Sequence, residues 1–138
     1  MDHLYYWQRF QADTRSGHIY KLNQNSGAMQ QIAPGDDVWA IGLVAPSLYG
    51  LIARFTVIEI GENAPGSPDF VEYGEHYFRS AKFLTTYFPL SRDVEAIIRS
   101  LSVTTNGRNL GQCFQGGAAV RQLSSADRLS LIAFTASF

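Results

Sequence analysis

The stretch VWAIGLVAPSLYGLIARFTVIEI, residues 38–60, decides the fold of this 138-residue chain. Residues 38–44 have the mostly apolar composition of a buried strand, and residues 51–60 read as a long strand rich in β-branched and aromatic side chains. The segment APSLYG interrupts this pattern with a proline and a glycine. We therefore predict a β-hairpin, preceded by a turn at APGDD, residues 33–37.

Further strands are expected on both sides of the hairpin. Residues 4–10 are rich in aromatic side chains and precede the polar segment QADTRSG, which is typical of a turn. Residues 61–69 contain two prolines and two glycines and therefore read as a loop. Residues 76–84 are predicted to form one more strand.

The last third of the chain has the pattern of helices. Apolar residues follow helical spacing after Ser91, a candidate N-cap, at positions Val94, Ile97, Ile98 and Leu101. Residues 106–120 read as a glycine-rich loop. Ser124 and Asp127 then form a predicted capping box ahead of a helix that buries Leu129, Ile132 and Ala133.

Together these elements predict an α+β fold, in which a small, strongly curved β-barrel carries two or three flanking helices. Residues 1–138 are expected to form a single domain, as the length suggests. The last helix is still apolar at Phe134 and Phe138, where the sequence stops. Such an ending is typical of a domain taken from a longer protein.

The composition indicates a globular protein of the cytoplasm. Hydrophobic residues make up 46% and charged residues 17% of the chain, which is unlike a disordered segment. No apolar run approaches the ~20 residues that a membrane helix needs, and residues 1–10 lack the zones of a signal peptide. Cys113 is the single cysteine, which excludes an internal disulfide and fits a reducing compartment.

The net charge of −1 argues against a broadly basic nucleic-acid binder, but the charge is unevenly distributed. Residues 1–75 carry four Lys or Arg against nine Asp or Glu, whereas residues 76–138 carry seven against three. Nine of the eleven basic residues are Arg, which favours planar, bidentate contacts to phosphates or bases. A general preference for Arg over Lys in the genome would give the same count.

Signatures of catalysis and of metal binding are not found in the sequence. His3, His18 and His76 lack metal-ligand spacing with Cys113, which is expected to be a small buried side chain. The adjacent Asp36 and Asp37 suit a turn better than a catalytic pair. The glycine pair at 116–117 follows CFQ and not a strand, so it does not match a phosphate-binding loop. We therefore expect a protein without catalytic activity, cofactor or metal.

The stretch YYWQRFQADTRSGHIYKL, residues 5–22, combines aromatic rings with cations. Rings and cations beside a TRSG turn suit the mouth of a binding site, where a ring stacks on a planar ligand and a cation meets its phosphate. Trp7 and Trp39 fit the protein core equally well.

The order of these elements resembles the EVE domains of the PUA-like superfamily. The resemblance rests on the aromatic first strand, the loop TRSGHIY, the segment PGDDVWAIG and the second hairpin strand GLIARFTVIEI. The C-terminal segment, residues 93–132, is similar to the tail that follows such a domain in bacterial EVE-HNH modification-dependent restriction endonucleases. No HNH-type metal motif is present, so the resemblance implies a nuclease domain that lies elsewhere, covalently linked or separate.

This resemblance implies a reader of modified bases in double-stranded DNA, with 5-methylcytosine or a related cytosine modification flipped into an aromatic pocket. Carried over from the family, the pocket residues are Trp7, Arg9, Phe10, Ser16, His18, Tyr20, Trp39, Leu43, Tyr49 and Tyr73. Phosphate contacts are expected from Arg15, Lys21 and Arg79. Tyr20 stands where related YTH domains carry a cage tryptophan.

Three other interpretations remain open at this point. A PUA-like RNA-binding module would use the same rings on a modified or unpaired nucleotide. An ASCH-like hydrolase of modified nucleosides is disfavoured, because no short segment combines Lys, Thr and Glu in a cluster. A domain that binds another protein would need the aromatic residues only for its core.

Overall fold

The computed structural model describes residues 1–25, 27–104, 109–114 and 119–138, and confirms the predicted α+β class. The strands in these residues are β1 (Asp2–Tyr6), β2 (Lys21–Gln24), β3 (Asp37–Ala45), β4 (Leu48–Thr56), β5 (Glu59–Glu62), β6 (His76–Arg79), β7 (Thr85–Tyr87) and β8 (Val120–Gln122). The α-helices are α1 (Phe10–Arg15), α2 (Pro68–Tyr73), α3 (Glu95–Arg99) and α4 (Ser125–Thr135). Short 3-10 helices are η1 (Gly27–Gln31), η2 (Lys82–Leu84) and η3 (Leu110–Phe114).

The larger sheet has five strands in the order β7-β4-β3-β1-β8. The predicted hairpin is confirmed as β3 and β4, which pair antiparallel around a turn at Pro46 and Ser47. β1 lies beside β3 and is parallel to it, with Leu4 opposite Trp39. The long second strand predicted over residues 51–60 is interrupted after Thr56, and the chain crosses there into another sheet.

The smaller sheet has three antiparallel strands in the order β2-β6-β5. Within the described residues the two sheets remain separate and do not close on each other, so the predicted strongly curved β-barrel is not confirmed. The predicted strand over residues 76–84 is shorter than expected, since β6 ends at Arg79 and residues 82–84 form η2.

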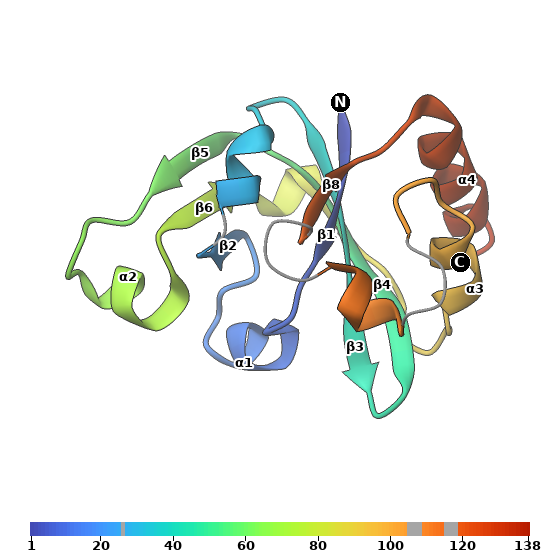
Figure 1. Ribbon diagram of the computed structural model, residues 1–138, viewed down its shortest axis with the longest axis horizontal. Coiled ribbons are helices and arrows are strands. Elements are labelled where there is room, and N and C mark those ends of the chain that lie inside the picture. Colours follow the sequence, from blue (N-terminus) through green and yellow to red (C-terminus); the bar gives the residue numbers. More distant parts are fainter. Residues whose placement is uncertain (26, 105–108, 115–118) are drawn as a thin grey trace.

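The molecule has three layers, because both faces of the larger sheet are buried (Figure 1). Along β1, Tyr5 and Trp7 contact the core beneath the smaller sheet, while Leu4 and Tyr6 contact the core beneath α3 and α4. Alternate residues of a strand point to opposite faces, so a strand buried on both sides is apolar at nearly every position. This explains the continuous apolar runs of β1 and β3.

The turn before β3 is held by its two acidic residues. Asp36 accepts a hydrogen bond from the backbone N–H of Ala33 at 3.0 Å and pairs with His3 at 2.9 Å. Asp37 lies 2.6 Å from the Arg54 guanidinium across the hairpin. Asp36 directly follows the turn at Pro34 and Gly35, whereas Asp37 is the first residue of β3.

Two helices occupy segments that the sequence assigned to a strand, a turn or a loop. β1 ends at Tyr6, and residues 10–15 form α1, so the predicted strand over 4–10 and the polar turn after it are wrong in these bounds. Residues 68–73 form α2 within and beyond the predicted loop. Its N-cap is Ser67, whose Oγ accepts from the Phe70 backbone N–H at 3.2 Å, and Pro68 starts the helix.

The helices α3 and α4 cover the outer face of the larger sheet (Figure 1). Ser91 does not cap α3, because the helix begins at Glu95 and the Glu95 backbone N–H bonds to the side chain of Asp93. The capping box of α4 is confirmed, with Ser124 and Asp127 bonding each other's backbone N–H at 3.1 Å.

The buried face of α4 differs from the predicted one. Leu131 is fully buried, Leu129 is 60% exposed, Ala133 is exposed and Ile132 is partly buried. The side chain of Asp127 also accepts hydrogen bonds from Ser102, which fixes the rotation of the helix over the sheet.

The predicted glycine-rich loop, residues 106–120, lies partly outside the described residues, as does the glycine pair at 116–117. Its described part contains η3, in which Cys113 is buried as expected. Among the helices that the structure describes, none has the length and apolar character needed to span a membrane.

Candidate functional site

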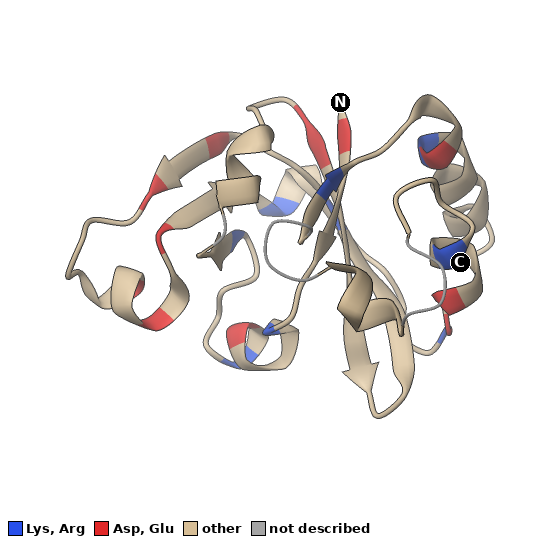
Figure 2. Cartoon of the chain, viewed as in Figure 1, with Lys and Arg blue, Asp and Glu red and all other residues tan. Residues whose placement is uncertain are grey.

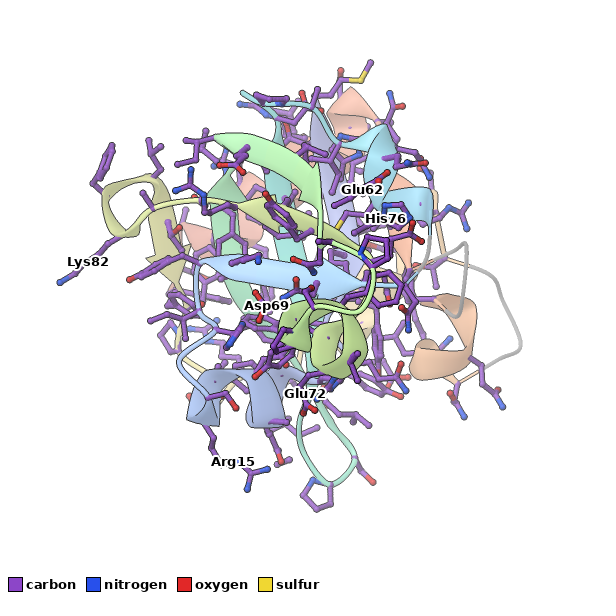
Figure 3. All side chains as sticks on the ribbon, turned by 90° about the vertical axis from the view of Figure 1, so that its left-hand side faces the viewer. Arg15, Glu62, Asp69, Glu72, His76 and Lys82 are labelled. Carbon is purple, nitrogen blue, oxygen red and sulfur yellow. The ribbon has the colours of Figure 1, made fainter. Side chains whose placement is uncertain are left out.

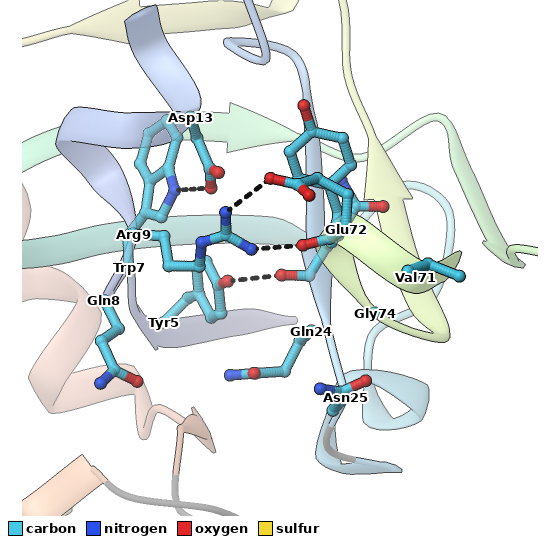
Figure 4. A pocket seen from close by; sticks show the side chains of 12 residues that line it. Tyr5, Trp7, Gln8, Arg9, Asp13, Gln24, Asn25, Val71, Glu72 and Gly74 are labelled. Atoms are coloured by element: carbon cyan, nitrogen blue, oxygen red, sulfur yellow. Dashed lines mark hydrogen bonds and ion pairs between the residues drawn. The ribbon is translucent and has the colours of Figure 1, made fainter. Parts of the chain in front are cut away.

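A pocket of about 190 Å³ opens between the end of β1, α1, β2 and α2 (Figure 4). β1, α1 and β2 are consecutive along the chain, and α2 joins them from a distant part of the sequence. The lining residues are Tyr5, Trp7, Gln8, Arg9, Asp13, Asn23, Gln24, Asn25, Val71, Glu72, Tyr73 and Gly74.

The inner wall of the pocket consists of a buried tryptophan and a buried carboxylate. Trp7 is 1% exposed and packs edge-on against Phe10, with 5.3 Å between ring centroids. Its Nε1 donates a hydrogen bond of 2.8 Å to Oδ2 of Asp13, which is itself only 6% exposed. The second oxygen, Oδ1, is also buried and has no hydrogen-bond partner among the residues that the structure describes. Buried acceptors are normally paired, so this oxygen lacks a partner that the donor group of a ligand could supply.

The short helix α1 places Asp13 at this position. The Asp13 backbone N–H bonds to the Arg9 carbonyl at 2.8 Å, and its own carbonyl accepts from the His18 N–H at 2.9 Å. Gly17 follows the helix with φ +80°, a left-handed conformation that favours glycine. A helix of six residues is too short to be stable by itself. The bond between Asp13 and the Trp7 indole therefore fixes the helix as well as the carboxylate.

The outer wall is formed by Arg9 and the last turn of α2. Arg9 Nη1 donates to the backbone carbonyl of Glu72 at 2.6 Å, and its Nη2 lies 3.6 Å from the Glu72 carboxylate. The guanidinium carbon lies 5.5 Å from the ring centroid of Tyr73, whose other neighbour is the His18 ring at 4.1 Å. The walls thus present the Arg9 cation, the Glu72 carboxylate and the Tyr73 ring.

Polar groups surround the remaining side of the pocket. Tyr5 donates a hydrogen bond from its hydroxyl to the Asn23 carbonyl at 3.4 Å. Burial, together with the nearby charge of Asp13, raises the pKa of Tyr5 well above its ordinary value, so the hydroxyl remains protonated. The side chains of Gln24 and Asn25 also line the pocket, and each amide offers both donors and an acceptor.

The structure brings together only part of the predicted pocket. Trp7, Arg9 and Tyr73 line it, and Phe10 supports Trp7 from behind. A separate hollow is lined by other predicted residues: Ser16, His18, Tyr20, Lys21 and Arg79. The contact between the tilted rings of His18 and Tyr73 connects the pocket with this hollow.

The remaining predicted pocket residues lie elsewhere. Trp39 is fully buried on the face of the larger sheet that packs against the helices, with the Arg54 guanidinium 4.5 Å from its ring centroid. Leu43 and Tyr49 lie near the end of the hairpin and line another hollow with Tyr6. The structure therefore separates Trp39, Leu43 and Tyr49 from the pocket beside Trp7.

The predicted phosphate contacts differ in their availability. Lys21 Nζ is bound to Asn63 at 3.0 Å and to Asp69 at 3.2 Å. Arg79 is held by Glu59, and the hydrogen bonds from Tyr77 and Arg79 lower the pKa of that carboxyl. Arg15 is exposed and has no ion pair within the described part of the chain.

Several pocket residues were not predicted from the sequence, above all Asp13, Glu72 and the amides of β2. The signal for α2 was present in the sequence as Ser67 followed by Pro68, an N-cap with proline at the first helical position. No local pattern marks Asp13, because its role depends on the indole of Trp7.

The chain matches no protein-family model and no curated protein. In the described ranges, no group of three or more His, Cys, Asp or Glu side chains is arranged to hold a metal ion.

Proposed function

We propose that this chain is a binding module that takes one modified base of DNA, a cytosine derivative, into the pocket beside Asp13. In this proposal the module reads the modification, and any cleavage of DNA requires a separate nuclease domain.

The unpaired Oδ1 of Asp13 carries the proposal. A carboxylate oxygen accepts hydrogen bonds only, so its natural partner is a donor such as the N4 amino group of cytosine. The site is nine-tenths buried, which strengthens a hydrogen bond to the charged oxygen. A base that enters with its amino group first would supply the missing hydrogen bond to Oδ1 of Asp13.

The size and lining of the pocket support a ligand of one planar ring. Its volume of about 190 Å³ is below the ~300–1,000 Å³ of pockets for drug-sized ligands. Extruding a base from a stack costs a few kcal/mol, and stacking on an aromatic ring such as Tyr73 returns ~1–3 kcal/mol. The hydrogen bond to Asp13 contributes further, so capture of a base is energetically feasible.

The arrangement of the strands is compatible with the resemblance to EVE domains. A mixed five-stranded sheet faces a small antiparallel sheet across one core, as two open parts of a strongly curved barrel would. An EVE domain of the PUA-like superfamily would act in a restriction or defence system in the cytoplasm. We include this assignment in the proposal, and the binding experiment below tests its central claim.

A second candidate function is the recognition of a base in RNA, and the side-chain amides that line the pocket favour it. Gln24 and Asn25 carry donors and acceptors that a ribose 2′-hydroxyl could meet. The same pocket would then hold a modified or unpaired nucleotide of RNA.

Binding titrations test the proposed function. The panel contains free nucleosides and oligonucleotides with cytosine, 5-methylcytosine, 5-hydroxymethylcytosine or N6-methyladenine, as DNA and as RNA. We expect the tightest binding with a modified cytosine in DNA, and recovery of the unchanged nucleoside, which distinguishes binding from hydrolysis. Equal affinity for every base in the panel would refute the reader function, and preference for the RNA series would favour the second candidate.

A further inference from the structure

A second hollow continues from the pocket along the outer side of α1. It has a volume of about 540 Å³ and shares Gln8 and Arg9 with the pocket. Its other lining residues are Gln11, Ala12, Arg15, Leu43, Ala45 and Pro46. We call this surface the α1 groove.

The α1 groove combines positive charge with apolar surface. Arg15 is exposed, and its only hydrogen bond among the described residues is a weak one of 3.3 Å to Gln11 in its own helix. Arg9 is held by a solvent-exposed pair with Glu72, which is readily exchanged for another anion. Leu43 is 42% exposed on the far side of the groove. Cations beside exposed apolar side chains suit a backbone with unstacked bases.

The opposite side of the pocket is acidic. Residues 55–78 contain five acidic residues, namely Glu59, Glu62, Asp69, Glu72 and Glu75, of which Glu59, Asp69 and Glu72 are paired with Arg79, Lys21 and Arg9. They lie on β5, on α2 and directly before β6, as Figure 2 shows among the charged residues that it colours. Figure 3 shows Glu62, Asp69 and Glu72 on one face, with Arg15 on α1 below them. We call this surface the acidic wall.

A duplex and a single strand meet these two surfaces differently. A duplex that offers an extruded base carries a phosphate backbone on each side of the gap, with one charge per ≈ 1.7 Å of helix axis. Glu72 lines the pocket itself, so one of these backbones would lie within a Debye length of the acidic wall. A single strand needs only one cationic side, and the α1 groove provides it.

We infer that the nucleic acid read by this pocket is single-stranded, with the nucleotides that flank the bound base lying along the α1 groove over Arg9 and Arg15. The acidic wall excludes the complementary strand. This inference rests on the proposed function and names its substrate class. It departs from the double-stranded DNA expected from the sequence.

The first experiment compares one short DNA sequence with a single 5-methylcytosine as a single strand and as a duplex, beside 5-methyldeoxycytidine as free nucleoside and an RNA strand of the same sequence. We expect the single DNA strand to bind about tenfold or more tightly than the duplex, because a duplex must also lose pairing and stacking. Equal or tighter binding of the duplex would overturn the inference and leave the proposed function intact, whereas binding of the nucleoside without binding of either DNA would overturn both. If none of the probes binds, both the inference and the proposed function are overturned. If the RNA strand binds more tightly than the DNA strand, the protein still binds a single strand, but its ligand is RNA.

The second experiment separates the acidic wall from the general cost of opening a duplex. Glu72→Lys should narrow the ratio of single-strand to duplex affinity severalfold, because the second backbone then meets a cation. Loss of the ion pair with Arg9 affects the single-strand and the duplex affinity alike, so a change in their ratio measures the effect of the acidic wall alone. Glu95→Lys on α3, away from the pocket, is the matched control. A ratio that is the same in both variants and in the parent protein would contradict the role of the wall.

The third measurement addresses the groove. Arg15→Ala should weaken single-strand binding and reduce the salt slope by about one unit, whereas Arg128→Ala on α4 should change neither. An unchanged slope in Arg15→Ala, with the parent's melting temperature, would place the strand elsewhere and overturn the path along α1.

Discussion

Replacing Asp13 by Asn should reverse the hydrogen-bonding character of the pocket without changing its shape. The Trp7 indole nitrogen is a donor only, and it lies 2.8 Å from the carboxylate. Asn must therefore turn its oxygen to the indole and its NH₂ group to the pocket. The NH₂ group of Asn then takes the place of the accepting Oδ1 and faces the amino group of a bound cytosine, so that two donors oppose each other.

The expected loss follows from this geometry. A well-placed hydrogen bond to a base edge is worth ≈ 1–3 kcal/mol of discrimination, which corresponds to roughly 5- to 150-fold in affinity for a cytosine derivative. Thymine and uracil carry a carbonyl oxygen in place of the amino group and should bind better to the variant than to the parent protein. The preference between the two kinds of base should therefore narrow or invert.

The stability of the fold, in contrast to the binding affinity, should change little in the Asp13→Asn variant. The indole loses a charged acceptor, and hydrogen bonds to charged groups contribute ≈ 1.5–3 kcal/mol against ≈ 0.5–1.5 kcal/mol for neutral ones. In return, a carboxylate that is 6% exposed and lacks a partner on one oxygen is replaced by a neutral group, which removes a desolvation cost. The two effects offset each other, so we expect a melting temperature close to that of the parent.

Binding titrations with 5-methylcytosine and thymine probes, run beside thermal melts, measure both effects. Asp2→Asn is the matched control, because Asp2 also accepts from an indole at 2.8 Å but lies away from the pocket. It should alter stability alone. An Asp13→Asn variant that keeps the parent's full preference for cytosine would refute the assignment of Oδ1, whatever its melting temperature.

Two further predictions concern α4. Asp127→Asn should lower the free energy of unfolding by about 1–2 kcal/mol at pH 7. Burial alone would raise the pKa of Asp127, but hydrogen bonds from Ser102 and Ser124 outweigh this effect and lower that pKa. The contribution of Asp127 to stability is therefore complete above the ordinary pKa of about 3.9 and is lost as the pH falls below it. Denaturant titrations of parent and variant should therefore converge as the pH falls below the lowered pKa of Asp127, and a difference that stays constant as the pH falls well below about 3.9 would contradict this. In the same assay, Leu131→Ala should lower the free energy of unfolding by ~2–5 kcal/mol and Leu129→Ala by less than ~0.5 kcal/mol. A larger loss for Leu129→Ala than for Leu131→Ala would contradict the observed buried face of α4.

The elements predicted correctly are those whose signal is local. The β3–β4 hairpin follows from two apolar runs around a short break, and the α4 cap follows from Ser124 and Asp127 at the spacing of a capping box. The rotation of α4 was not predicted, because apolar residues occur on several sides of it. Ser102, a residue distant in sequence, fixes that rotation through Asp127.

The candidate site was harder to predict, because its decisive contacts join segments that are distant in sequence or lack periodicity. The resemblance to EVE domains implies Trp7, Arg9 and Tyr73 as pocket residues, and the structure places these three residues around one cavity. The segment around Asp13 was interpreted as a turn, since a six-residue helix shows no apolar period. Trp39 matched the expected composition of a cage residue, yet the parallel pairing of β1 with β3 places it on the other face of the sheet.

The two tryptophans provide an internal comparison that bears on the role of Asp13. Each indole donates a 2.8 Å hydrogen bond to an aspartate, Trp39 to Asp2 and Trp7 to Asp13. In the first pair the second carboxylate oxygen is matched by Arg128 at 3.4 Å, as expected for an aspartate with a structural role. In the second pair that oxygen is buried and has no partner in the described part of the chain, and Asp13 is one of the residues that line the pocket. An indole needs only one acceptor, so a neutral side chain would serve the fold at lower cost. Folding does not explain an unpaired second acceptor on a pocket residue, whereas binding a ligand with a donor group does.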